Sequence, residues 1–269
     1  MRIDLHNHTY YSDGVYSPEE LVLRAKQNNV DIFALTDHDT TLGVDECVKM
    51  GEKHGLRIIK GCEVSASYED ESVHIVCLFK NNIVGQEIID YAKEFKNKRK
   101  QRAIDMMHNM EKYYNLRINL DEFLDTNGVL TRGNMIRHIM KYNNLSMDEA
   151  RKYILPDSKA YIPSTKISVD DAISLIKRSN GIAIFAHPCL IKNQDNVYEI
   201  LKSDFDGIEV RYANPKNDEE KFRSLALKHN LLMSAGSDCH GDKSHADIGS
   251  ACLNEEEFLP IAQKLNFKI

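Results

Sequence analysis

Short apolar runs alternate with helical patterns along most of the chain. Runs that predict buried strands occur at residues 2–5, 31–35, 56–59, 73–79, 182–186, 207–210 and 231–235. Patterns that predict helices lie at 43–54, 168–179, 218–229 and 255–265, and Ser17, Pro18 and Glu20 form the expected start of another helix. Strands that alternate with helices indicate parallel βαβ units. About seven such units favour a barrel over an open sheet, although the period alone does not choose between them.

The pattern changes between residues 89 and 164. This stretch is polar, helical in period and poor in β-branched runs, and further helices are predicted at 134–142 and 146–153. Its basic run at 93–102 is interspersed with acidic residues, which favours a solvated helix face over an RNA-binding surface. We therefore expect a catalytic domain of residues 1–88 and 165–269, with a helical insertion at 89–164 that caps the substrate.

Composition narrows the class of protein. The 269 residues are 42% hydrophobic and 28% charged, with a formal net charge of −6, which is typical of a globular protein and argues against a nucleic-acid coat. No secretory signal pattern and no apolar run of membrane-spanning length is found, so a cytoplasmic location without a membrane partner is expected. The six cysteines form no Cys-x-x-Cys pair, which favours reduced thiols.

Histidines and carboxylates follow the predicted strands at the points where those strands end. Since the carboxyl ends of parallel strands meet on one face, side chains far apart in sequence should converge there. His6 and His8 lie two residues apart on an extended segment, so their imidazoles point to the same side. The other residues of this kind are Asp13, Asp37, His38, Asp39, Glu63, His187, Asp238 and His240.

The mixture of imidazoles and carboxylates suits Zn, Mn or Fe(II). There are too many candidate ligands for one ion, so we expect two or three divalent ions that share Glu63 as a bridge. Asp37 and Asp39 are expected to orient ligand imidazoles. His74 lies at the start of its apolar run. Either its strand runs against the others or it lies on a loop, and the sequence leaves both possibilities open.

The ordered motifs also resemble those of a known family. Asp4-Leu5-His6-Asn7-His8, Ser12-Asp13-Gly14, Thr36-Asp37-His38-Asp39, Gly61-Cys62-Glu63, His74, Ala186-His187-Pro188 and Gly236-Ser237-Asp238-Cys239-His240 are similar to the motifs of the polymerase and histidinol phosphatase (PHP) family. The resemblance implies an α/β fold, a distorted (β/α)7 barrel with a metal cluster. It also implies one metal on His6, His8, Glu63 and Asp238, a second on Asp13, His38 and His240, and a third on Glu63, His74 and His187.

Within this family the chain is similar to small phosphoesterases that act on nucleotides. That resemblance implies phosphate binding by Arg132 and Lys159, where a planar guanidinium suits bidentate contact with phosphate. Asn134, which stands where the family motif has a histidine, and Arg211 are further candidates. Arg132, Asp13 and His240 are the expected catalytic residues.

The expected reaction is hydrolysis of AMP, a nucleoside 3′,5′-bisphosphate or short 5′-phosphorylated RNA by a metal-bridging hydroxide. Alternatives are a histidinol-phosphate-type or other small-molecule phosphatase, and hydrolysis of a non-phosphate bond. A non-catalytic nucleic-acid-binding module with a structural metal is a rival from another class. Structural sites are closed and have four ligands, which argues against it. The oligomeric state is left open.

Overall fold

The computed structural model of the protein describes residues 1–125, 130–163 and 166–269. The chain divides into two compact units, Met1–Ala92 with Lys166–Ile269, and Lys93–Thr165. The sequence predicts the first border between residues 88 and 89, whereas the two units divide between Ala92 and Lys93. The second predicted border, between residues 164 and 165, lies outside the described residues. Within the described ranges, no helix is both long and apolar enough to span a membrane.

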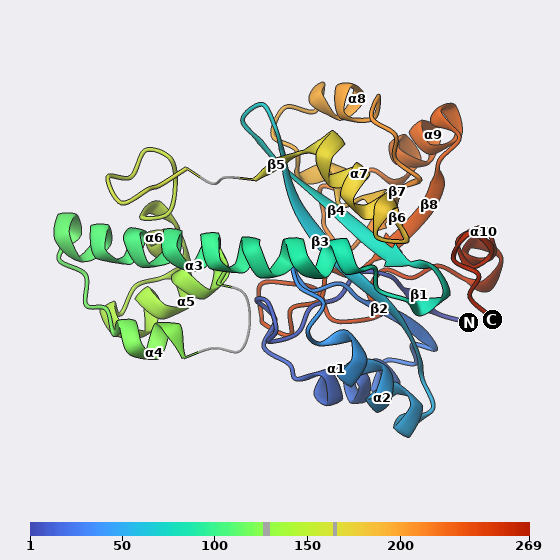
Figure 1. Ribbon diagram of the computed structural model, residues 1–269, viewed down its shortest axis with the longest axis horizontal. Helices are drawn as coiled ribbons and strands as arrows, with labels where there is room; N and C mark the ends of the chain where they lie inside the picture. The colour runs from blue at the N-terminus through green and yellow to red at the C-terminus, as the bar shows by residue number, and fades with distance from the viewer. Residues whose placement is uncertain (126–129, 164–165) are drawn as a thin grey trace. The chain divides into compact units, whose positions relative to one another are not determined.

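The first unit is built on one curved sheet with helices around it (Figure 1). Its strands follow the order β1-β2-β3-β4-β6-β7-β8, and β5 pairs with β3. The bounds are β1 Ile3–Asp4, β2 Ile32–Leu35, β3 Arg57–Tyr68, β4 Glu71–Phe79, β5 Ile167–Ser168, β6 Gly181–Phe185, β7 Gly207–Tyr212 and β8 Leu232–Gly236. Leu5 N donates to Ala235 O at 3.0 Å, which joins the two ends of the sheet. The expected α/β barrel is confirmed.

Strand β4 runs antiparallel to both of its neighbours, β3 and β6. This direction settles the question that the sequence left open, because it brings His74, near the start of β4, to the same end of the barrel as the ends of the parallel strands. The expectation that Glu63 follows a short strand at 56–59 is wrong. Glu63 lies inside β3, whose backbone pairing with β4 continues to Tyr68 although the inward-facing positions are polar.

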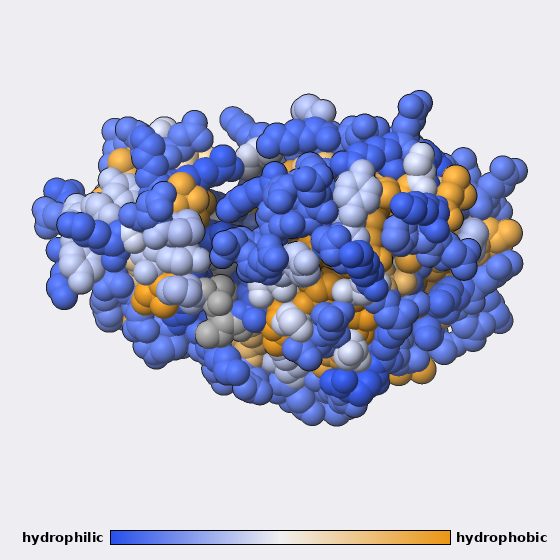
Figure 2. Space-filling model, turned by 90° about the horizontal axis from the view of Figure 1, so that it is seen from above, coloured by the Kyte–Doolittle hydropathy of each residue, from blue (hydrophilic) through white to orange (hydrophobic). Residues whose placement is uncertain are grey.

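The alternation of side chains along the strands separates a barrel interior from an outer layer. Val76 and Leu78 face an inner core with Ile59, whereas Ile75 and Cys77 face an outer core. Because Glu63 and His74 share the parity of the inner residues Ile59 and Val76, their side chains point into the barrel. On the face in Figure 2 hydrophilic residues predominate, with smaller apolar groups among them.

Two helices of this unit begin where the capping residues in the sequence predict. Ser17 and Glu20 form a capping box at α1 (Pro18–Gln27), and Ser168 caps α7 (Val169–Arg178). The remaining helices are α2 Val44–His54, η1 Lys80–Asn82, η2 Pro188–Leu190, α8 Asn196–Ile200, α9 Glu219–His229 and α10 Glu255–Leu265. The short elements α8 and β5 were not expected, since five and two residues are too few to establish a period.

The second unit is helical. It contains most of α3 (Gln86–Tyr114), then α4 (Leu120–Leu124), α5 (Arg132–Asn143) and α6 (Met147–Lys152), drawn largely in green in Figure 1. Its core is rich in methionine, including the buried Met106, Met107, Met110 and Met135. Flexible thioether side chains fill irregular gaps between short helices, and they can form a core without β-branched runs.

Candidate metal centre

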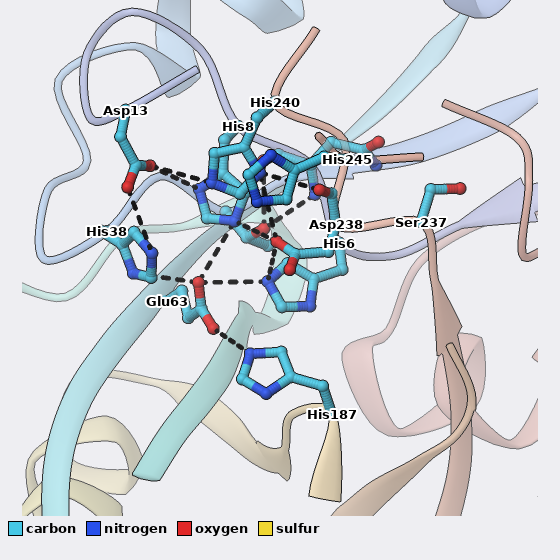
Figure 3. A network of polar contacts seen from close by, with 12 residues as sticks. His6, His8, Asp13, His38, Glu63, His187, Ser237, Asp238, His240 and His245 are labelled. Carbon is cyan, nitrogen blue, oxygen red and sulfur yellow. Dashed lines mark hydrogen bonds and ion pairs between the residues drawn. The ribbon is translucent and has the colours of Figure 1, made fainter. Parts of the chain in front are cut away.

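Imidazoles and carboxylates from six strands converge at one end of the barrel. They come from the segments after β1, β2, β6 and β8 and from the interiors of β3 and β4 (Figure 3). Eight of the nine expected ligands form three groups whose ligand atoms lie within 4.8 Å of one another. The ninth, His187, contacts Glu63 with its Nε2 at 3.1 Å. The sequence separates these residues widely, and the barrel brings them together.

Glu63 lies at the centre of the cluster, and its side chain is fully buried. Five imidazole nitrogens surround its two oxygens. Oε2 is 3.2 Å from His6 Nε2, 3.2 Å from His8 Nε2 and 3.0 Å from His38 Nδ1, and Oε1 is 3.1 Å from both His74 Nδ1 and His187 Nε2. A carboxylate with different histidines on its two oxygens has the arrangement that a bridge between metal ions requires.

Two of the three groups contain an aspartate. Asp238 Oδ1 lies 3.0 Å from His8 Nε2, and Asp13 Oδ1 lies 3.1 Å from His240 Nε2. One group joins His6, His8, Glu63 and Asp238, as the family resemblance implies. The other two differ from the implied sets, because His8 joins Asp13, His38 and His240, and His38 joins Glu63 and His74. His8 and His38 therefore each belong to two neighbouring groups.

Several of these atoms lack a hydrogen-bond partner in the described part of the chain. They are His6 Nε2, His8 Nε2, His38 Nδ1 and Glu63 Oε2, all buried. An unsatisfied buried polar atom costs about 1–3 kcal/mol, so four of them around one point need a compensating interaction. Divalent cations bound by the three groups would satisfy them. The residues thus fit a metal cluster, and their nitrogen and oxygen donors suit Mn, Fe or Zn.

At Glu63, Asp238, His38 and His74 the electrostatics favour the protonation states that ligands need, whereas nearby carboxylates raise the pKa of His6, His8, His187 and His240 against the effect of burial. Burial alone would raise the pKa of Glu63, but the surrounding imidazoles hold that pKa well below its ordinary value. The pKa of Asp238 is likewise held well below its ordinary value against the effect of burial, chiefly by His6 and His240. Burial lowers the pKa of His38 and His74, which favours their neutral forms. Ionised carboxylates and neutral imidazoles are the forms that bind metals.

Glu209 supports the cluster from behind, and the sequence pattern did not reveal it. Its Oε1 lies 3.3 Å from His6 Nδ1, and its Oε2 accepts a hydrogen bond from the backbone N–H of His187 at 2.6 Å. Glu209 interrupts the apolar run of β7 at an inward position, between the outward-facing Ile208 and Val210. An acidic residue inside an otherwise apolar strand was the signal in the sequence that could have identified Glu209 as part of the site. Tyr212, three residues after Glu209, donates to Asp238 Oδ2 at 3.0 Å.

Asp37 and Asp39 were expected to orient imidazoles, and the structure gives them a less direct role. Asp37 accepts hydrogen bonds from the Thr9 backbone at 2.8 Å and from Ser12 Oγ at 2.6 Å. Ser12 Oγ in turn lies 3.4 Å from His8 Nδ1, so Asp37 reaches His8 through Ser12. Asp39 accepts from the Ser65 backbone at 2.8 Å and thereby fixes β3 beside the cluster.

Three of the expected phosphate-binding residues belong to the helical unit. Arg132 is the first residue of α5, and the side chain of Asn134 accepts hydrogen bonds from Thr131 N and Oγ1, both at 2.8 Å, in a capping box. Lys159 donates its backbone N–H to Tyr114 Oη at 2.9 Å. The Asn134 side chain is therefore used to start the helix.

The fourth candidate, Arg211, belongs to the barrel unit and is paired with carboxylates. Its Nη2 lies 2.8 Å from Glu219 Oε1 and 3.0 Å from Glu257 Oε1. Arg223 binds the same two carboxylates, so Arg211 is part of a network that joins β7 to α9 and α10. The Arg211 guanidinium is therefore paired with carboxylates that hold these elements together.

Comparison with known proteins agrees with this geometry. Residues 4–167 match a family model described as the PHP domain. The 5′-3′ exoribonuclease Rnm of Escherichia coli is 31% identical over 91% of this chain and 87% of its own length. The 3′,5′-nucleoside bisphosphate phosphatase of Chromobacterium violaceum is 29% identical over 98% of this chain and 94% of its own length.

Two solved structures share the fold. An amidohydrolase from Chromobacterium violaceum, solved with bound sulfate, has a TM-score of 0.86 and 27% identity over 99% of this chain and 96% of that chain. A protein from Bifidobacterium adolescentis has a TM-score of 0.86 and 24% identity over 97% of this chain and 96% of that chain. With the family match and the cluster of possible metal ligands, these findings show that the chain belongs to the PHP family and is a metal-dependent phosphoesterase.

Proposed function

We propose that this enzyme hydrolyses phosphate esters of nucleotides, namely AMP, nucleoside 3′,5′-bisphosphates or short 5′-phosphorylated RNA. The observation that carries the proposal is the convergence of five imidazoles on the buried carboxylate of Glu63. Relatives that match nearly the whole chain support the nucleotide class, since they are named an exoribonuclease and a nucleoside bisphosphate phosphatase.

The proposed cofactor is a set of two or three Mn, Fe or Zn ions. His6, His8, Glu63 and Asp238 would hold one ion, Asp13, His38 and His240 a second, and Glu63, His74 and His187 a third. Bound ions of this kind lower the pKa of a coordinated water and offset the charge of the phosphoryl group. The unsatisfied atoms His6 Nε2 and Glu63 Oε2 support the first of these sites most directly.

The exposed side of the cluster suggests where the phosphate binds. The side chains of His8 and Glu63 have no exposed surface, whereas those of Asp13, His38 and His74 are 12%, 11% and 20% exposed. A phosphate that approaches from solvent therefore meets the side formed by Asp13, His38 and His74 first. Because Asp13 lies on this exposed side, we propose that Asp13 and His240, whose Nε2 it contacts at 3.1 Å, are the catalytic pair that positions the reacting groups.

The helical unit supplies the proposed phosphate ligands. Arg132 would spread the charge that grows on the phosphoryl oxygens, because its guanidinium donates two parallel hydrogen bonds to an anion. Lys159 would add a point charge, and Asn134 would hold the turn that presents Arg132. The bound sulfate of the related solved structure supports an anion site in this fold.

The test measures the products released by Mn²⁺-loaded protein, which are inorganic phosphate from a phosphate monoester and mononucleotide from RNA. The substrates are AMP, 3′,5′-bisphosphoadenosine, a 5′-phosphorylated trinucleotide and histidinol phosphate. Asp238→Ala should abolish turnover, because it removes a carboxylate that contacts His8 Nε2 at 3.0 Å. Asp206→Asn is the matched control, since Asp206 accepts a hydrogen bond from the Ala183 backbone next to the amino end of β7.

Turnover of a nucleotide or of RNA that Asp238→Ala loses and Asp206→Asn keeps would support the proposal. Turnover of histidinol phosphate alone would replace the nucleotide class by a small-molecule phosphatase. Absence of both phosphate and mononucleotide release from every substrate, with metal bound, would favour the second candidate, hydrolysis of a non-phosphate bond. The related structure named an amidohydrolase is the observation that supports this candidate.

A further inference from the structure

Three large apolar side chains are exposed on the two loops that follow β1 and β2. They are Tyr10, Val15 and Leu42, with 37%, 45% and 57% of their surface exposed. The same two loops carry Asp13 and His38. Exposed apolar side chains beside a polar cluster are typical of a binding site, because a bound ligand covers them and removes their surface from water.

Tyr10 is held in place although its side chain is exposed. Its backbone N–H donates to Tyr16 O at 2.9 Å, and its ring packs on that of Tyr11, with centroids 4.8 Å apart and a tilt of 40°. Tyr11 is itself fixed, because its hydroxyl donates to Glu46 at 2.8 Å at the start of α2. An aromatic surface that is ordered before binding loses little conformational freedom when a ligand stacks on it.

A short chain of contacts connects this tyrosine pair with the cluster. A Cβ atom at Gly43 would lie 2.6 Å from Tyr11 Cδ2 and 3.3 Å from Asp37 Oδ2, so the Tyr11 ring and Asp37 border the same point. Asp37 accepts from Ser12 Oγ at 2.6 Å, which lies 3.4 Å from His8 Nδ1. Tyr10 follows His8 by two residues, a separation that the backbone spans in at most about 7 Å.

We propose that Tyr10 is the base-stacking residue of the active site, and that Val15 and Leu42 extend the same apolar rim. The inference rests on the proposed function, because it assumes a nucleotide whose phosphate binds the metal cluster. Every nucleobase has a π face, so an exposed tyrosine at this distance would favour nucleotides over base-free sugar phosphates without selecting one base. Tyr10 would thus set substrate class through binding and take no part in the chemistry.

The experiment compares AMP with ribose 5-phosphate, which lacks the base. Steady-state rates are measured for the Mn²⁺-loaded wild type, Tyr10→Ala and Tyr10→Phe. Loss of stacking on one base should raise KM for AMP about 10-fold in Tyr10→Ala, with kcat unchanged. The KM for ribose 5-phosphate should stay the same. Tyr10→Phe keeps the ring and should behave as wild type. Tyr198→Ala, on α8, is the control for loss of a tyrosine of similar exposure (42%).

The possible failures are distinguishable. If the wild type hydrolyses none of AMP, 3′,5′-bisphosphoadenosine and the 5′-phosphorylated trinucleotide, the proposed nucleotide function is wrong, and the inference fails with it. If the wild type hydrolyses AMP but Tyr10→Ala leaves both KM values unchanged, or raises both equally, the stacking role alone is refuted. A fall in kcat without a rise in KM would also refute it, because stacking on the base would then not contribute to binding.

Discussion

Replacing Glu209 with glutamine tests whether the residues behind the cluster control metal binding. Both oxygens of Glu209 face N–H donors, His6 Nδ1 at 3.3 Å and the backbone of His187 at 2.6 Å. A hydrogen on His6 Nδ1 leaves the lone pair of Nε2 directed toward Glu63 and Asp238. Glutamine has nearly the same shape but only one acceptor oxygen. Its amide NH2 must therefore face one of the two donors.

The expected magnitude follows from this mismatch. Loss of the group that orients a ligand imidazole lowers metal affinity by about 10- to 100-fold, equivalent to about 1.4–2.7 kcal/mol of binding free energy. The metal-free protein should also lose about 1–3 kcal/mol of unfolding free energy, because one buried donor remains unsatisfied. Glu209 is only 2% exposed, so water cannot replace the lost acceptor.

The assay is calorimetric titration of metal-free protein with Mn²⁺, together with thermal melts. Glu71→Gln is the matched control, because Glu71 is also buried and accepts hydrogen bonds from the backbones of Lys192 and Asn193, at 3.1 and 2.8 Å. Both variants should melt earlier, but only Glu209→Gln should bind Mn²⁺ more weakly. Unchanged Mn²⁺ affinity in Glu209→Gln, or an equal loss in the control, would refute the orienting role.

Three further outcomes are expected. Gly236→Ala should weaken Mn²⁺ binding and lower the melting temperature, because the new Cβ would lie 2.2 Å from His6 Cβ; wild-type affinity in a metal titration would contradict this. Burial alone would lower the pKa of His8, but the adjacent carboxylates of Asp238 and Glu63 raise it to about 10. The resulting stability of the metal-free protein should be fully present below about pH 6.5 and be lost as the pH rises toward 10, a trend that His8→Gln should flatten in melts across that range. Ser17→Ala should reduce the unfolding free energy by about 1 kcal/mol in urea titrations without changing Mn²⁺ affinity, because it removes only a helix cap.

The barrel illustrates how far local patterns reach. Caps such as Ser17 and short apolar runs such as 182–186 depend on neighbouring residues, so they predicted α1 and β6 closely. The extent of β3 was not predictable in this way. Its inward residues near Glu63 are polar because they face the cluster, and the strand is held by antiparallel backbone pairing with β4, which follows β3 after a tight turn. A prediction based on apolar side chains therefore ends this strand too early, because the backbone pairing continues to Tyr68.

The sequence by itself determined the chemistry of the centre, because the residue types and their places after strands such as 2–5 and 231–235 can be read in order along the chain. Only the tertiary structure decided the direction of β4, which brings His74 to Glu63, and the support of His6 by Glu209 across 203 residues. The physical reason is that ligand geometry depends on strand order and direction. Those are set by pairing between distant segments, which no local period records.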